Sequence, residues 1–93
     1  MKYVLVRAHL AGVFAGELVE RNGKEVTLKD ARRLWRWTGA ASLSQMAVSG
    51  TSNPSGCKFP ETVPLVLLLE AIEILDVTPK ARKSIESVPV WRV

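Results

Sequence analysis

The sequence predicts a mainly β fold of the α+β kind: a small, strongly bent β-barrel or β-roll of about five strands with two short helices. Short apolar and β-branched runs follow one another between turn residues, and one pair of runs is joined by Asn-Gly. Only two segments have helical spacing of their apolar residues. A chain of 93 residues forms one domain, residues 1–93.

Four strands are expected in the first part of the chain. They cover Tyr3–Ala8, Val13–Glu20, Lys24–Lys29 and Ala31–Trp37. Asn22-Gly23 supplies the positive φ angles of a two-residue hairpin turn between the second and third strands. Gly16, inside the second strand, marks a bulge or a tight bend.

A fifth, long strand is expected at Val66–Val77, where apolar residues occupy both faces. Such a strand is buried on both sides, either in the sheet or in a subunit interface. Because a chain this short cannot cover both faces, the pattern also predicts a homo-oligomer.

The two expected helices flank this long strand. In residues 40–48, Leu43, Met46 and Ala47 have helical spacing, and Gly50 is a natural C-cap. Residues 50–60 read as a loop. The second helix begins with Thr78 as N-cap and Pro79 in the first turn, and it ends before Pro89.

Charge and composition restrict the compartment and the partners. The net charge of +4 favours anionic partners mildly, since 13 basic residues are offset by 9 acidic ones. A single cysteine, Cys57, excludes an internal disulfide. The longest apolar run is interrupted by Glu70 and Glu73 and is shorter than the roughly 20 residues of a membrane span. We therefore expect a soluble cytoplasmic protein without a membrane segment.

No group of residues suggests catalysis. His9 is the only histidine and has no evident nucleophile beside it, and Glu70 and Glu73 would lie on opposite faces of a strand. Lys58 could lower the thiol pKa of Cys57, but no histidine is near in sequence. Phosphate-binding, dinucleotide and zinc motifs do not occur. The expectation is a protein that is not an enzyme, with no metal and no cofactor.

The central part of the chain predicts a binding site for a small anion, and a nucleotide fits best. On a strand, Arg33, Trp35 and Trp37 would project together, which combines two stacking surfaces with a guanidinium. The helix that follows would direct its first N–H groups toward an anion. Hydroxyl and ammonium donors would complete the site: Ser42, Ser44, Thr51, Ser52 and Lys58.

Trp35 and Trp37 also have a second interpretation. An aromatic stripe on a strand is commonly part of the core or of a subunit interface, and the Gly/Ser/Thr-rich loop could be a simple connection. The arginines around the tryptophans and the length of the loop favour a functional site. Both interpretations remain open at the level of the sequence.

Nearly the whole chain resembles a known family. The stretch GVFAGELVERNGKEVTLKDARRLWRWTGAASLSQMAVSGTS, followed by CKFP, AIEILDVT and VPVW, resembles a family of small tailed-bacteriophage proteins known mainly as a domain of unknown function. The resemblance implies a phage accessory protein acting in the host cytoplasm, with no assigned chemistry. Arg36 and Thr38 depart from the family pattern, which has an aromatic residue and an acid there. Residues 13–34 are also similar, locally, to Sm-like and SH3-like small β-barrels.

Together these observations lead to two hypotheses. The first is a non-enzymatic phage accessory protein that sequesters a nucleotide immune signal of the host, an anti-defence sponge. The alternative is an Sm-like or SH3-like adaptor that binds RNA or inhibits a host protein.

Overall fold

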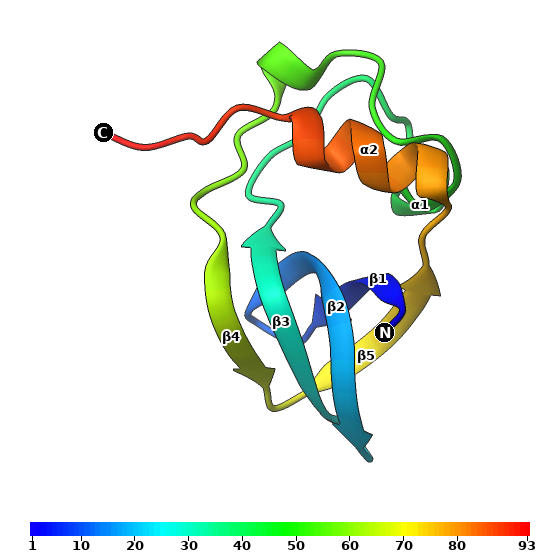
Figure 1. Cartoon of the computed structure of the whole chain (residues 1–93), viewed down its shortest axis with the longest axis vertical. Coiled ribbons are helices and arrows are strands. Elements are labelled where there is room, and N and C mark those ends of the chain that lie inside the picture. Colours follow the sequence, from blue (N-terminus) through cyan, green and yellow to red (C-terminus); the bar gives the residue numbers. More distant parts are fainter.

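The computed structural model describes residues 1–93 and consists of one antiparallel sheet with helices beyond one of its ends (Figure 1). Its elements are β1 (Tyr3–Ala8), β2 (Gly12–Asn22), β3 (Glu25–Arg33), α1 (Leu43–Ser49), a 3₁₀ turn η1 (Pro54–Gly56), β4 (Val63–Leu68), β5 (Ala71–Asp76) and α2 (Pro79–Ser87). No helix is long and apolar enough to cross a membrane.

The sheet is strongly bent but open. Its strand order is β4-β3-β2-β1-β5, so that two strands consecutive in sequence lie at opposite edges. A flat sheet would separate these edges by about 19 Å, which the connection through Leu69 and Glu70 is too short to span. The sheet must therefore curl, as expected, but β4 and β5 do not pair with each other, and closure into a barrel is not observed.

Gly16 permits this curvature. The pairing of β2 with β3 shifts register between Ala15 and Glu17, which confirms the expected irregularity. A Cβ at position 16 would lie 3.1 Å from the Cα of Ala31 and 3.2 Å from the Cβ of Leu28. The two strands thus approach each other so closely that a side chain here would fit only if its neighbours shifted by a few tenths of an ångström.

Two apolar clusters form, one on each side of the central strands. The first lies between the sheet and the helices and contains Leu5, Val13, Ala15, Leu34, Leu43, Met46, Ala47, Cys57, Phe59, Ile85 and Val88. The second lies within the bend of the sheet and contains Val4, Val6, Ala8, Phe14, Val26, Leu28, Ala31 and Leu68. Strand β1 contributes alternate residues to both clusters, so both of its faces are buried.

The hairpin between β2 and β3 forms one residue later than expected. Asn22 pairs with Glu25, so the central turn residues are Gly23 and Lys24. Of these only Gly23 has a positive φ, 64°. A turn with glycine at its first central position needs no positive φ from asparagine.

The expected strand Ala31–Trp37 is wrong. Ala31–Arg33 instead complete β3, which continues through Asp30 although that residue has a φ of 50°. The Leu34 N–H still donates to the Val13 carbonyl of β2 at 2.8 Å. The chain then leaves the sheet and forms a single bridge, Arg36 to Lys58. Residues 31–33 thus form a strand as expected, but Asp30 is an irregularity within β3 and not a break between two strands.

The expected strand Val66–Val77 is also wrong, because it is two strands. β4 pairs with β3 and β5 pairs with β1, and the chain turns at Leu69-Glu70 between them. This turn lacks glycine, proline or asparagine, so the usual local signal is missing. Glu70 is held there by its carbonyl, which accepts a 2.8 Å hydrogen bond from the His9 N–H.

Both predicted helices are confirmed. Ser42 caps α1 by accepting a hydrogen bond from the Gln45 N–H, and Gly50 ends it with a φ of 73°. Thr78 caps α2 in the same way, accepting from the Ala81 N–H. The buried residues of α1 are the three whose spacing predicted the helix.

Arg32 joins the sheet to the segments that cover it. Its guanidinium is buried and donates to the carbonyls of Phe59 (3.3 Å), Pro60 (3.3 Å) and Ile85 (3.1 Å). It also lies 5.3 Å from the centroid of the Phe59 ring. Burial lowers the pKa of Arg32 from its usual value, and the group stays charged because an arginine titrates so far above neutral pH.

Replacing Arg32 should therefore destabilise the whole fold. We expect Arg32→Ala to lower the free energy of unfolding by about 3 kcal/mol, since hydrogen bonds from a charged group contribute about 1.5–3 kcal/mol. Urea denaturation measures this loss. Arg36→Ala is the matched control, because that side chain is exposed and a change within about 0.5 kcal/mol is expected. Equal effects of the two substitutions would contradict this role of Arg32.

Candidate functional site

Three segments come together beside the end of β3. Arg36 and Lys58 exchange two backbone hydrogen bonds, of 3.2 and 2.8 Å, and Phe59 forms a parallel bridge with Val90. The Trp91 N–H donates to the Phe59 carbonyl at 2.9 Å. Residues 34–37, 57–60 and the C-terminal tail thus form a small extended layer outside the main sheet.

This layer presents two tryptophans and a lysine on the surface. The rings of Trp35 and Trp91 stack, with centroids 6.3 Å apart and an angle of 14° between their planes. The Lys58 Nζ lies 5.4 Å from the centroid of the Trp91 ring. Trp35 is 63% exposed and Trp91 is 42% exposed. We call Trp35, Trp91 and Lys58 the tryptophan platform.

A shallow cavity of about 410 Å³ adjoins the platform. Its lining residues are Leu10, Ala11, Gly12, Val13, Arg33, Leu34 and Trp35. Arg33, the last residue of β3, and Trp35, which follows the strand, thus line the same cavity. The Arg33 guanidinium also lies 4.6 Å from the centroid of the Phe14 ring.

Sequence reasoning missed two residues of this region. Trp91 lies far from the other tryptophans in sequence, and the only available signal was its residue type near the end of a chain with three tryptophans. Leu10, in the turn between β1 and β2, has a φ of 62° and is 94% exposed at the rim of the cavity. A leucine in the left-handed region is uncommon and often marks a functional position.

Trp37 takes a different place from Trp35. It is half-buried and packs against the first apolar cluster, between the sheet and the helices. The expected common projection of Arg33, Trp35 and Trp37 is therefore only partly present, because the strand that was to align them does not continue beyond Arg33.

The predicted hydroxyl donors mostly hold their own segment together. Ser42 caps α1, and Ser44 is exposed on it. The Thr51 hydroxyl donates to the Thr38 carbonyl and accepts from the Asn53 N–H, while the Ser52 hydroxyl donates to the Gly39 carbonyl. The hydrogen bonds that Thr51 and Ser52 donate join the loop to residues 38 and 39, before α1, and do not run toward the tryptophan platform.

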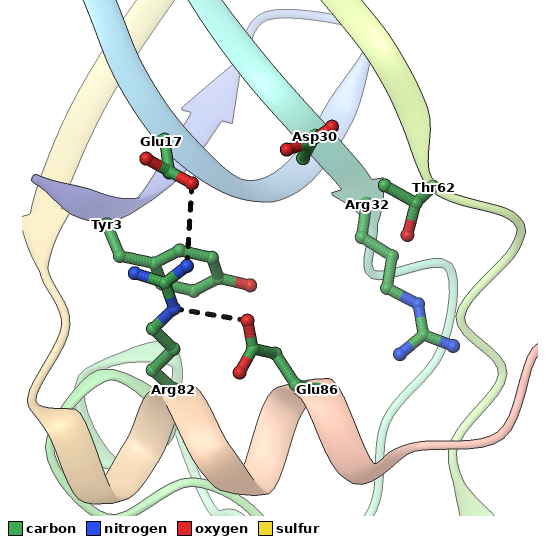
Figure 2. Close-up of a pocket in the computed structure, with 7 residues that line it drawn as sticks. All are labelled: Tyr3, Glu17, Asp30, Arg32, Thr62, Arg82 and Glu86. Carbon is green, nitrogen blue, oxygen red and sulfur yellow. Dashed lines mark hydrogen bonds and ion pairs between the residues drawn. The ribbon is translucent and has the colours of Figure 1, made fainter. Parts of the chain in front are cut away.

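A second, charged cavity of about 160 Å³ lies between the sheet and α2 (Figure 2). It is lined by Tyr3, Glu17, Asp30, Arg32, Thr62, Arg82 and Glu86. Arg82 forms ion pairs with Glu17 (3.5 Å) and Glu86 (3.1 Å), and its guanidinium lies 4.5 Å from the centroid of the Tyr3 ring. Because Arg82, Glu17 and Glu86 compensate one another's charges, and Arg32 is held by carbonyls, the arrangement favours a structural role over ligand binding.

The charge balance is different at the tryptophan platform. None of Arg33, Arg36 and Lys58 forms an ion pair, and the nearby Glu61 is paired with Arg92 at 3.4 Å. The platform therefore combines exposed aromatic rings with uncompensated positive charge. This combination can stack on a flat ring and attract an anion next to it.

Comparison with known proteins identifies a family but no function. A family model described as a domain of unknown function (DUF6948) matches residues 1–85. No curated protein and no solved structure was found to match the chain.

Tyr3, in the charged cavity, should make the stability of the fold depend on pH above 10. Burial, and secondarily the Glu86 carboxylate, raise the pKa of Tyr3 from 10.0 to about 12. The neutral phenol is thus favoured in the folded state, so this stabilisation is complete below pH 10 and is lost as the pH rises toward 12. Tyr3 is the only tyrosine, so tyrosinate absorbance of the native protein reports on this group alone. We expect a midpoint well above 10, and a midpoint near 10 would contradict the burial of the phenol.

Proposed function

This chain belongs to the family of the domain of unknown function DUF6948, and we propose that it binds a nucleotide on the tryptophan platform without catalysing a reaction. In this proposal the base stacks on Trp35 and Trp91, and Lys58 and Arg33 contact the phosphate. The single observation that supports it best is the exposed, near-parallel pair of tryptophans beside uncompensated cations.

The exposure of the tryptophans argues for a binding role. Burying a tryptophan is strongly favourable, and Trp37 shows that this fold has room for one against its core. Trp35 nevertheless stays on the surface, fixed by the backbone bridge between Arg36 and Lys58. Stacking a base on an aromatic side chain contributes about 1–3 kcal/mol.

The cations supply the second half of the proposed site. Charge-assisted hydrogen bonds from guanidinium and ammonium groups to a phosphate are roughly twice as strong as neutral ones. Lys58 is held beside the Trp91 ring, and Arg33 lines the adjoining cavity. A nucleotide whose base stacks on the platform would therefore have its phosphate near Lys58 and Arg33.

The biological role that we propose is sequestration. The resemblance to tailed-bacteriophage proteins suggests an accessory protein in the host cytoplasm, where a non-enzymatic nucleotide binder could remove a nucleotide signal of host defence. Such a sponge needs affinity and abundance, and it needs no catalytic groups.

An adaptor of the Sm-like or SH3-like kind is the second candidate. The observation that favours it is the openness of the platform, since Trp35 is 63% exposed and a longer RNA strand could continue past a single stacked base. A host protein with an acidic, aromatic surface would use the same groups.

A thermal-shift screen distinguishes these roles. The probes are cyclic dinucleotides, cyclic ADP-ribose isomers and short RNA. A ligand at 100 times its dissociation constant adds about 2.7 kcal/mol of stability. A nucleotide sponge should respond to one small probe with a shallow salt dependence, whereas an RNA adaptor should respond to RNA with a steep one. No shift with any probe would leave the host-protein adaptor as the function to test.

The two tryptophans of the central segment should separate binding from folding. We expect Trp35→Ala to weaken nucleotide binding by about 1–3 kcal/mol, through lost stacking, with little effect on the unfolding midpoint. Trp37→Ala should lower the free energy of unfolding by about 2 kcal/mol, less than the about 3–5 kcal/mol of a fully buried tryptophan, because this ring is only half-buried. Isothermal titration measures the binding affinity and urea denaturation the free energy of unfolding. If Trp35→Ala destabilised the fold and Trp37→Ala weakened binding instead, Trp35 would not be a binding residue.

The cation at the cavity provides a further check. Arg33→Ala should weaken binding by about 1.5–3 kcal/mol, as expected for a lost charge-assisted hydrogen bond, while the protein stays folded. Lys80→Ala is the control, because Lys80 is an exposed cation on α2 and lies outside both cavities. If both variants bind with the affinity of the unmodified protein, Arg33 does not contact the ligand.

A further inference from the structure

The outer face of strand β4 carries a row of exposed apolar side chains. Val63, Leu65, Leu67 and the following Leu69 are 45%, 63%, 56% and 64% exposed. No charged residue occurs from Thr62 to Leu69. Edge strands of monomeric proteins usually carry charges or are covered, because a bare edge pairs with other chains.

The backbone of this edge is free to form hydrogen bonds. Asn22 and Glu25 close a two-residue hairpin, so the N–H and C=O of Glu25 point to β2. Because these groups alternate along a strand, the N–H and C=O of Val26 point to β4. Val26 lies opposite Leu68. By alternation, Val66 and Leu68 bond to β3, while Leu65 and Leu67 direct their N–H and C=O groups to the open edge.

Pro64 does not interrupt this open edge. By the same alternation it faces β3, opposite Asp30, where the ladder pairing is already absent. Its missing N–H therefore costs nothing on the outer side. The residues that face outward can all donate and accept.

We propose that β4 pairs in antiparallel fashion with β4 of a second copy of this chain, giving a two-fold symmetric dimer. The apolar run Val63–Leu69 is centred on Val66, and a dyad at Val66 matches the run to itself. Leu65 then lies opposite Leu67 of the second copy. The exposed leucines of the two chains form one continuous row, and the two sheets join into one.

The distribution of charge favours this partner over the other edge of the sheet. The β5 edge strand contains Glu73 and Asp76, which pair with Arg7 and Lys2 of the same chain. Pairing β4 with β5 of another copy would bring carboxylates against the leucine row. Pairing β4 with itself brings no like charges together along Val63–Leu69.

The small contact area of a single pair of strands limits the affinity expected for the dimer. It covers a strip smaller than the about 800 Å² per partner of a standard interface. We therefore expect dimers at micromolar concentrations, with dissociation on dilution. The surface is distinct from the tryptophan platform, and this inference does not depend on the proposed function.

Light scattering at about 100 µM tests the dimer. We expect a mass near twice the 10.2 kDa of one chain. Leu67→Lys should return the mass to that of the monomer without shifting the unfolding midpoint by more than a few degrees, because the side chain is exposed in the monomer. Val19→Lys, which replaces an exposed apolar residue of β2 away from the edge, is the matched control and should remain dimeric.

Cysteine cross-linking tests the register. A mixture of Leu65→Cys and Leu67→Cys chains should form the mixed disulfide at least several-fold faster than either variant alone forms its own, because only the mixed pair is directly opposed. Cys57 is buried and can stay. A monomeric mass at this concentration, or a ring of three or more chains, would overturn the proposal. Dimers that persist in Leu67→Lys, or that lack the mixed disulfide preference, would also overturn it.

Discussion

The buried guanidinium of Arg32 is the interaction on which the rest of the architecture depends. Arg32 lies near the end of β3 and donates to carbonyls from two separate segments, the loop at Phe59 and Pro60 and the end of α2 at Ile85. No carboxylate shares in this arrangement. A cation whose hydrogen bonds all go to backbone carbonyls fixes the path of the chain and not merely the position of side chains, since each carbonyl has to turn inward to reach it.

The position of the tryptophan platform follows from this arrangement. Phe59 lies between Lys58, which belongs to the platform, and Pro60, whose carbonyl contacts Arg32. The tail that carries Trp91 leaves from the end of α2, where Arg32 contacts Ile85. The exposed tryptophan platform is thus held in place by the buried guanidinium of Arg32. The residue that stabilises the fold thus also positions the backbone segments that carry the proposed binding surface.

Much of the fold could be predicted from local signals. The N-cap at Thr78, the C-cap at Gly50, the spacing of Leu43, Met46 and Ala47, and the irregularity at Gly16 depend on neighbours in sequence, and these predictions are confirmed. The strand boundaries near Asp30 and Glu70 depend on which distant strand each segment pairs with. Glu70 has no turn residue beside it, and Asp30, a residue type common in turns, lies within one strand. The number of strands agrees with the prediction only because the strand expected at Ala31–Trp37 is absent and the one expected at Val66–Val77 is two strands.

The candidate site was less accessible to sequence reasoning. Arg33 and Trp35 could be singled out because aromatic and basic residues are interleaved there. Arg32 lies in the same run, and nothing in its neighbours in sequence indicates that its guanidinium is buried against three carbonyls. Trp91 reaches Trp35 only through the bridge between Phe59 and Val90, a contact between segments far apart in the chain.

The attachment of the tail has a thermodynamic consequence. The tail that carries Trp91 is connected to the remainder of the protein by the hydrogen-bonded bridge to Phe59, by contacts of the Trp91 ring with Trp35 and Lys58, and by the exposed ion pair of Arg92 with Glu61. Segments with so few contacts open at a small fraction of the global unfolding free energy. A molecule that stacks on both rings must immobilise this segment, so part of its binding enthalpy is offset by lost chain entropy. Affinity at this surface is then set as much by the freedom of a few terminal residues as by the contacts themselves.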